Sequence, residues 1–171
     1  MNLESIYTYR DATHADIEQL KQLGLASYGK YAPNLTADNL EKLQHGMASD
    51  KTWLDVLAIA KSFLCVYKDK IVAMAFIVPR GNAWEFFENE WSYIRLVGVH
   101  PLHEGRGLAK ALTQRCIDHA ISSGERVIAL HTSEQMKAAR HIYERLGFKI
   151  LRELEPRLGM KYWLYTLEIE G

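Results

Sequence analysis

The feature that most constrains the fold is a strand, a glycine-containing loop and a helix that follow one another directly. The apolar run from Trp91 to Val99 is typical of a buried strand and ends just before Pro101. A helix with one apolar face is then expected from Arg106 to Ser123, closed by Gly124. The first N–H groups of such a helix have no intrahelical partners, and together with the helix dipole they form a site for an anion.

Neither of the two common phosphate-binding motifs fits this loop. A P-loop needs Gly-Lys followed by Ser or Thr, whereas this chain has Gly107-Leu108-Ala109. A dinucleotide-binding fold needs an acidic residue at the end of the next strand, where Leu130-His131-Thr132 stand. The loop glycines still let the backbone approach an anion without a Cβ in the way. The sequence therefore predicts an anion site of another kind.

The surrounding pattern predicts an α+β fold in a single domain of residues 1–171. Hairpins followed by a β-α-β unit imply a mixed, mostly antiparallel, twisted sheet of about seven strands with helices on both faces. The expected strands are 6–10, 62–67, 71–78, 91–99, 127–131, 148–154 and 161–169. The expected helices follow Thr13 and Thr36 or cover 53–58, 106–123 and 135–146.

The composition narrows the classes of partner. Lys and Arg number 21, as do Asp and Glu, so the charge balance argues against nucleic acid or an anionic membrane as main partner. No apolar run reaches the about 18 residues of a membrane span, and residues 1–5 lack the order of a signal peptide. Cys65 and Cys116 are expected to be buried, reduced thiols, and the histidines lack zinc-type spacing. We therefore expect a cytoplasmic protein without a metal site.

Two motifs together resemble the GNAT superfamily of N-acetyltransferases. The first is Arg/Gln-x-x-Gly-x-Gly/Ala after a strand that ends in Val-x-Pro, and it is matched by Val99, Pro101, Gly107 and Ala109. The second is a tyrosine-bearing helix that ends in Gly-Phe, here residues 139–148 with Tyr143. The two motifs stand in the order that the family has, with a strand between them.

The resemblance implies transfer of an acetyl group from acetyl-CoA to a primary amine of a small molecule or peptide, by direct attack in a ternary complex. The loop would hold the pyrophosphate, and the preceding strand would pair with the pantetheine arm. The implied contacts to acetyl-CoA are Leu96, Val97, Gly98, Val99, Glu104, Gly105, Arg106, Gly107, Leu108, Ala109, Lys110 and Tyr143. Residues 62–171 would form the acyl-CoA-binding core, and residues 1–61 the acceptor side.

Acyl transfer to an amine needs a base, an oxyanion donor and an acid for the leaving thiolate. The resemblance implies Tyr143 as the acid, since a phenol has a pKa of roughly 10 and a thiol roughly 8.5. It also implies a backbone N–H near Val97 as the oxyanion donor. Glu88 and Glu90, which lie just before the strand, are candidates for the base.

Two positions depart from the family pattern. Glu104 stands where Arg or Gln is preferred, so its carboxylate should point away from the pyrophosphate, with Arg106 and Lys110 as compensating phosphate partners. Met136 stands where many members have Asn. These departures keep open a second interpretation, a non-catalytic acyl-CoA-binding sensor of the same fold.

The acceptor side is less defined. Glu85, Glu88 and Glu90 are interspersed with Trp84, Phe86, Phe87 and Trp91, which predicts an acidic, aromatic rim for a cationic amine, a hydrophobic lid or a solvated loop. The resemblance also implies that Tyr28, Tyr31 and Trp53 line the acceptor cleft. The apolar segment Tyr162 to Tyr165 predicts either an exposed edge that pairs in a homodimer or a buried strand.

Overall fold

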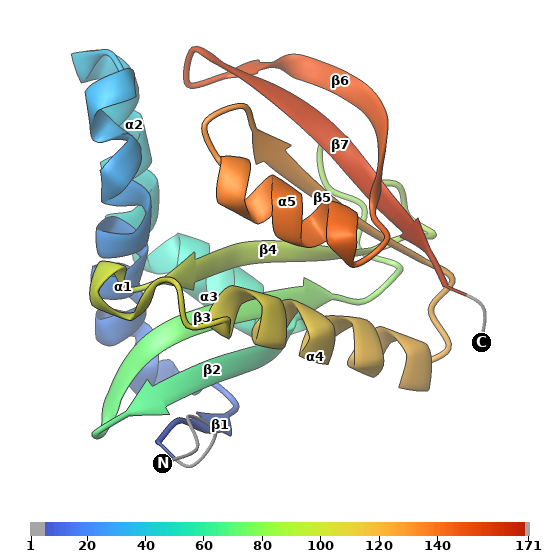
Figure 1. Ribbon diagram of the computed structural model, residues 1–171, viewed down its shortest axis with the longest axis horizontal. Coiled ribbons are helices and arrows are strands. Elements are labelled where there is room, and N and C mark those ends of the chain that lie inside the picture. Colours follow the sequence, from blue (N-terminus) through green and yellow to red (C-terminus); the bar gives the residue numbers. More distant parts are fainter. Residues whose placement is uncertain (1–5, 170–171) are drawn as a thin grey trace.

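The computed structural model describes residues 6–169, which form a seven-stranded sheet with helices on both faces (Figure 1). The strand order is β1-β2-β3-β4-β5-β7-β6, and every neighbouring pair is antiparallel except β4 and β5. The strands are β1 (Thr8–Arg10), β2 (Lys61–Tyr67), β3 (Lys70–Val78), β4 (Ser92–Val99), β5 (Val127–Ser133), β6 (Lys149–Arg157) and β7 (Met160–Glu168). The predicted mixed, mostly antiparallel sheet is confirmed.

Residues 6–169 form five α-helices, of which the first two follow capping signals of the sequence. They are α1 (Ile17–Tyr28), α2 (Ala37–Ala48), α3 (Asp50–Ile59), α4 (Leu108–Ser122) and α5 (Lys137–Arg145), with the 3-10 turns η2 (His14–Asp16), η3 (Gly29–Asn34) and η4 (Pro101–His103). Before α1, the Asp16 carboxylate accepts a hydrogen bond from the Thr13 N–H at 2.8 Å. The Thr36 hydroxyl caps α2 by accepting from the Asn39 N–H at 3.2 Å.

Strand β3 is buried on both faces and separates two cores. Ala73, Ala75 and Ile77 pack on the face covered by α4 and α5, whereas Met74 and Phe76 pack against α1 and α3. This alternation follows from the two-residue period of a strand. The fold therefore has one helical layer on each side of the central strands.

Trp53 belongs to the second of these cores and not to a cleft. Its side chain is fully buried, its ring centroid lies 6.1 Å from that of Phe76, and its indole N–H donates to the Met47 carbonyl at 2.9 Å. The expectation that Trp53 lines the acceptor cleft is wrong, because α3 packs this residue against the sheet.

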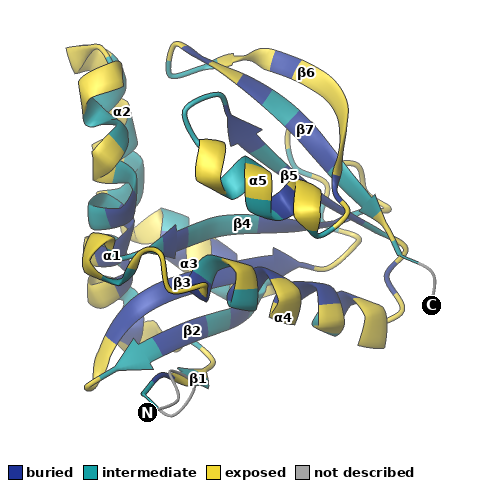
Figure 2. Cartoon of the chain, viewed as in Figure 1, coloured by how far each residue is buried: buried dark blue, intermediate teal, exposed yellow. Residues whose placement is uncertain are grey.

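Strand β7 is an interior strand. It lies between β5 and β6 and pairs with both, and Leu164 and Tyr165 are fully buried. The prediction of an exposed edge at Tyr162 to Tyr165 is therefore wrong, and its alternative, a buried strand, is confirmed. The edge strand at this end of the sheet is β6, which Figure 2 shows as largely exposed beside the more buried β7.

Two other sequence expectations can be checked against the packing. Cys65 and Cys116 are buried free thiols. Among the helices within residues 6–169, none combines the length and the apolar character needed to cross a membrane.

Candidate active site

The sheet opens between β4 and β5. These parallel strands pair only near their beginnings, at Ser92 with Ile128 and at Tyr93 with Ala129. Beyond Tyr93 they separate, and a cavity of about 890 Å³ is lined by β4 from Ile94 to Val99 and by β5 from Leu130 to Thr132. The second half of β4 therefore presents backbone that has no partner on the β5 side.

A bulge in β4 lies at the centre of the cavity wall. The register with β3 shifts between the pairs Met74–Gly98 and Phe76–Arg95, and Leu96 has a φ of 55°. A bulge leaves backbone groups unpaired and bends its strand. The Tyr28 hydroxyl donates a hydrogen bond of 3.1 Å to the Val97 carbonyl, which ties the bulge to α1.

Close packing of α1 against β4 requires the glycine in this stretch. A Cβ built on Gly98 would lie 2.6 Å from the Ser27 Oγ and 3.0 Å from the Met74 Cε. Because real Cβ atoms do not approach so closely, a side chain at this position would push α1 away from the bulge. All four residues of this stretch that were expected to contact acyl-CoA line the cavity, namely Leu96, Val97, Gly98 and Val99.

The predicted anion loop opens onto the same cavity. Gly105 and Gly107 have φ values of 76° and 78°, a conformation that glycine adopts without strain. Gly107 is the N-cap of α4, and no side chain caps the helix. Among the described residues, no loop, turn or cap hydrogen bond is donated by the backbone N–H groups of Leu108, Ala109 or Lys110. These N–H groups are therefore available to an anion.

The charged residues in and beside this loop differ in whether they face the cavity. Arg106 and Lys110 are exposed and do not line the cavity, and the Arg106 guanidinium donates to the Tyr7 hydroxyl at 3.2 Å. Glu104 lines the cavity and forms an ion pair of 2.8 Å with Lys30 of η3. The carboxylate that departs from the family pattern is thus balanced by a lysine that sequence analysis did not single out.

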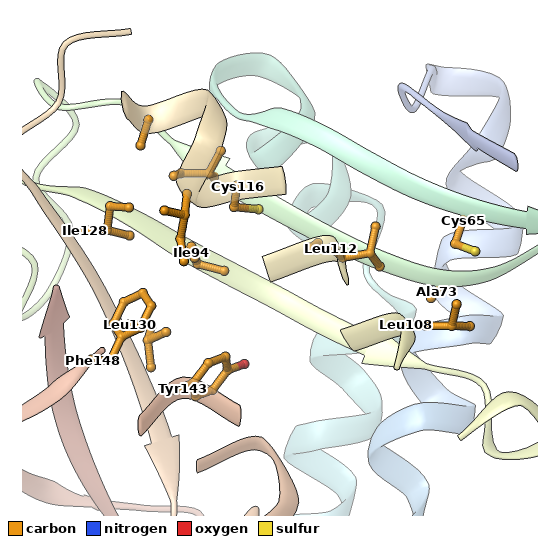
Figure 3. Packing of buried hydrophobic residues seen from close by; sticks show 14 of the residues in the cluster. Cys65, Ala73, Ile94, Leu108, Leu112, Cys116, Ile128, Leu130, Tyr143 and Phe148 are labelled. Carbon is orange, nitrogen blue, oxygen red and sulfur yellow. The ribbon is translucent and has the colours of Figure 1, made fainter. Parts of the chain in front are cut away.

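Tyr143 of α5 lies on the opposite wall. Its side chain is 7% exposed, and its hydroxyl points away from Phe148 in Figure 3. Burial raises the pKa of this phenol above its usual value, and the neighbouring Cys116 and Tyr31 add to the effect. None of the hydrogen bonds within residues 6–169 involves the Tyr143 hydroxyl. It is therefore a protonated donor without a hydrogen-bond partner in the described part of the chain.

Other aromatic residues complete the cavity on the side of the N-terminal helices and of β7. Tyr28 and Tyr31, which the resemblance implied for the acceptor side, line the cavity, and so does Tyr162. His131 of β5 lines it as well, and its Nδ1 is buried without a partner among the described residues. Burial lowers the pKa of His131 to about 3, and the positive charges of Arg157 and Arg95 act in the same direction. The imidazole is therefore neutral at pH 7.

The candidate bases lie elsewhere. Neither Glu88 nor Glu90 lines the large cavity, and Glu90 lines a smaller depression together with Arg80 and Arg126. The third carboxylate of the expected acidic rim, Glu85, is ion-paired with Arg157. The loop thus brings Trp84 to the cavity without bringing free carboxylates with it.

Sequence analysis missed the basic side chains of the cavity wall. Arg95 and Arg157 line it, and the Arg95 guanidinium stacks on the Trp84 ring at 4.1 Å from its centroid. The signal for Arg95 was present, since it is a single charge inside an otherwise apolar strand. No cluster of three or more His, Cys, Asp or Glu residues that could hold a metal ion occurs in the described part of the chain.

Comparison with known families agrees with this geometry. The family model described as "Acetyltransferase (GNAT) family" matches residues 31–148, which is more than half of the chain. The chain belongs to the GNAT acetyltransferase family. The match includes the β4 bulge, the glycine loop and Tyr143, and the predicted family is confirmed.

Curated relatives match over shorter stretches. An L-amino acid N-acyltransferase of Escherichia coli (strain K12) is 37% identical over 70 residues, covering 40% of this chain and 40% of the relative. An L-methionine sulfoximine/L-methionine sulfone acetyltransferase of Salmonella typhimurium is 32% identical over 84 residues, covering 47% of this chain and 48% of the relative. The chain thus matches less than half the length of these two relatives.

Solved structures share the fold over nearly the whole chain. The PaiA N-acetyltransferase of Thermoplasma acidophilum, in complex with coenzyme A, superposes with a TM-score of 0.77 at 12% identity and covers 95% of this GNAT chain and 99% of its own. A YncA acetyltransferase structure from Salmonella typhimurium, with acetyl-CoA, superposes with a TM-score of 0.64 at 18% identity, covering 96% and 95%. Both are similar to this chain in fold.

Proposed function

We propose that this protein is an acetyl-CoA-dependent N-acetyltransferase that acetylates the primary amine of a small molecule by direct attack in a ternary complex. The observation that carries the proposal is a single cavity lined by unpaired β4 backbone, by the glycine loop and by the Tyr143 side chain. Family membership and the acyltransferase names of the curated relatives support the same reaction class.

The residues fit a CoA thioester in three places. The free N–H groups at the start of α4 suit the pyrophosphate, and Gly105 and Gly107 permit close approach. The β4 backbone beyond Tyr93 lacks a partner on β5, so the amides of the pantetheine arm can pair with it as an added strand would. The apolar wall that includes Leu108 and Ile142 suits the pantetheine carbons.

The thioester supplies an activated acyl group, and the protein's residues stabilise the charges that form during transfer. A backbone N–H of the β4 bulge near Val97 donates to the developing oxyanion. The Tyr143 hydroxyl donates its proton to the departing thiolate. Burial raises the pKa of Tyr143, so the phenol is protonated and can supply this proton.

The amine must lose its own proton before it attacks. Glu104 is the one carboxylate residue among the described residues that line the cavity, and it is ion-paired with Lys30. We therefore propose that the ammonium proton leaves to water, without a carboxylate base. The rate with saturating acetyl-CoA should then rise with pH towards the pKa of the acceptor amine.

The test is an amine screen that reports free CoA thiol, combined with calorimetry of acetyl-CoA. We expect acceptor-dependent thiol release, and we expect Tyr143→Phe to lower kcat about a hundredfold while the Kd for acetyl-CoA changes less than about threefold. Tyr165→Phe is the matched control, since its hydroxyl bonds to Arg140 and Glu144 outside the cavity. Tight binding of acetyl-CoA without thiol release for any amine would instead identify a sensor.

A further inference from the structure

Arg95 differs from the other arginines of residues 6–169. It is partly buried, and no hydrogen bond or ion pair engages its guanidinium. The other partly buried arginines have partners, since Arg140 donates to Tyr165 and Arg157 pairs with Glu85. An arginine stays charged at physiological pH even though burial lowers the pKa of Arg95. A shielded cation without a partner is unfavourable unless a ligand supplies the anion.

The position of Arg95 on β4 separates its charge from the phosphate site. Ile94, the preceding residue, packs with Leu112 and Cys116 of α4, as Figure 3 shows. Because side chains alternate along a strand, Arg95 projects to the opposite face. There it stacks on Trp84, which in turn stacks on Tyr93 with 6.4 Å between the ring centroids. The loop and the start of α4 lie on the other face, so Arg95 is not a pyrophosphate ligand.

No carboxylate among the described residues forms an ion pair with Arg95, although the Glu85 carboxylate lies near enough to oppose the lowering of its pKa. Lys30 is paired with Glu104, and Arg157 is paired with Glu85. Lys42 also lines the cavity, but it is exposed to solvent on α2. The positive charge of Arg95 reaches Tyr28, whose raised pKa it partly opposes, and Tyr28 bonds to the Val97 carbonyl. Arg95 therefore lies beside the proposed reaction centre, on the face opposite α4.

We propose that the acceptor is an amine that carries a carboxylate, as in an α-amino acid or another short amino acid, and that Arg95 binds this carboxylate. The inference rests on the proposed acetyltransferase function and names its substrate class. Val97 is two residues from Arg95, at most about 7 Å along the strand since the bulge at Leu96 bends the path, so a molecule whose amine and carboxylate are a few bonds apart can reach both positions. Guanidinium and carboxylate form paired, charge-assisted hydrogen bonds, and Trp84 holds the guanidinium plane in place.

The proposal replaces the expectation of an acidic rim that attracts a cationic amine. The carboxylates on which that expectation depended are paired or lie away from the cavity, as with Glu85 and Glu90. Four side chains of the described lining, Lys30, Lys42, Arg95 and Arg157, carry a positive charge, against one carboxylate. A zwitterionic acceptor enters this lining more favourably than a polyamine does.

The experiment compares acids with their amides. Each of the twenty standard amino acids that the protein acetylates is paired with the corresponding amino acid amide, and O-phosphoethanolamine and 3-methylbutylamine are added to the set. We expect kcat/KM for the amide to be about ten- to a hundredfold below that for the acid. Arg95→Gln should lower kcat/KM for the acid by a similar factor and leave the amide within about threefold, which removes the preference.

Two further variants guard against a general loss of structure. Arg115→Gln is the matched control, because Arg115 also stacks on an aromatic ring, at 3.9 Å from the Tyr9 centroid, but lies outside the cavity. It should keep the preference for the acid. Arg95→Lys should recover part of the preference, since it restores the charge without the paired geometry. Melting temperature and the Kd for acetyl-CoA of Arg95→Gln should stay near those of the unmodified protein.

The outcomes separate the two proposals. Acetylation of amines with no preference for the carboxylate, a preference that survives in Arg95→Gln, or a preference for O-phosphoethanolamine would overturn the inference and leave the acetyltransferase function standing. A protein that binds acetyl-CoA and acetylates no amine would overturn the proposed function itself. A calorimetric titration of the CoA complex with leucine would then decide about the carboxylate site, since binding that Arg95→Gln abolishes would support it and no binding would overturn it.

Discussion

The two walls of the cavity differ in the kind of group that they present. The wall proposed for acetyl-CoA consists mainly of backbone, namely the bulge at Leu96, the glycine loop and the start of α4. The wall proposed for the acceptor consists of side chains, such as Arg95, His131 and Tyr31. Backbone geometry depends on a few glycines and on local chain direction, so one scaffold can keep it while the side chains of the other wall differ. The contrast implies that substitutions in the two walls affect different steps.

The largest effect on acetyl-CoA binding is expected from a substitution in the backbone wall. Gly107→Val places a β-branched residue at a φ of 78°, which such residues rarely adopt, and should weaken acetyl-CoA binding about thirtyfold by displacing the N–H groups at the start of α4. Calorimetry measures the change in Kd.

The matched control for this variant is Gly124→Val at the other end of α4. Gly124 has a φ of 76°, and at both glycines an added Cβ would meet no atom within 4 Å. The backbone strain is therefore comparable, and the melting temperature should fall in both variants. If Gly124→Val weakened acetyl-CoA binding as much as Gly107→Val does, the effect would be one of stability alone.

A smaller effect is expected in the side-chain wall, on stability against pH. The pKa of His131 is lowered to about 3 in the fold, whereas an unfolded histidine titrates near 6.5. A lowered pKa means that the stability contribution is complete above about pH 6.5 and is lost as pH falls towards 3. Between pH 6.5 and 4.5 the protein should lose about 2 kcal/mol of unfolding free energy through this group.

Thermal melts at these two pH values measure this contribution. His131→Gln, which has no group that titrates in the range, should show a smaller decrease in melting temperature than the unmodified protein. Asp16 must be taken into account, because its hydrogen bonds to Arg10 lower its pKa and its contribution is lost only as pH falls further, below about 4. Equal decreases in both proteins would contradict the assignment to His131.

The smallest effect concerns the ion pair that joins the two walls. Lys30→Met would leave the Glu104 carboxylate without its partner near the proposed phosphate site, and should weaken acetyl-CoA binding about two- to fivefold at low salt. The effect is small because both side chains are more than 40% exposed. Combining it with Glu104→Gln should restore the affinity, and a double variant as weak as Lys30→Met would argue against a role for the pair.

Most helices and strands could be predicted because their signals are local. Caps at Thr13 and Thr36, a hairpin turn at 68–70 and the glycine after each of the last two helices define most element boundaries. The helices α4 and α5 begin about two residues later than periodicity suggests, since Gly107 adopts the left-handed region and Met136 lies outside helical values. The strand order was harder to predict from the sequence, because the edge position of β6 depends on pairing between distant segments.

The site residues could likewise be predicted where they belong to local motifs, and were missed or misplaced where distant contacts position them. The loop and Tyr143 belong to compact motifs, and the structure brings them together around one cavity. Trp53 was misplaced because an aromatic residue on a helix gives no sign of whether it faces the core or a cleft. Lys30 and Arg157 were missed because their partners, Glu104 and Glu85, lie 74 and 72 positions away in the sequence. Such pairs follow from the topology and not from any local pattern.

The short pairing between β4 and β5 has a consequence for how the molecule unfolds. Backbone pairing between the β1-β2-β3-β4 half of the sheet and the β5-β7-β6 half is limited to two residue pairs, at Ser92 and Tyr93. Hydrogen exchange in the free protein should therefore report two cooperative units with different opening free energies. A molecule that lies along the unpaired β4 backbone would extend the ladder across the gap, so binding should slow exchange in both halves together and merge them into one unit.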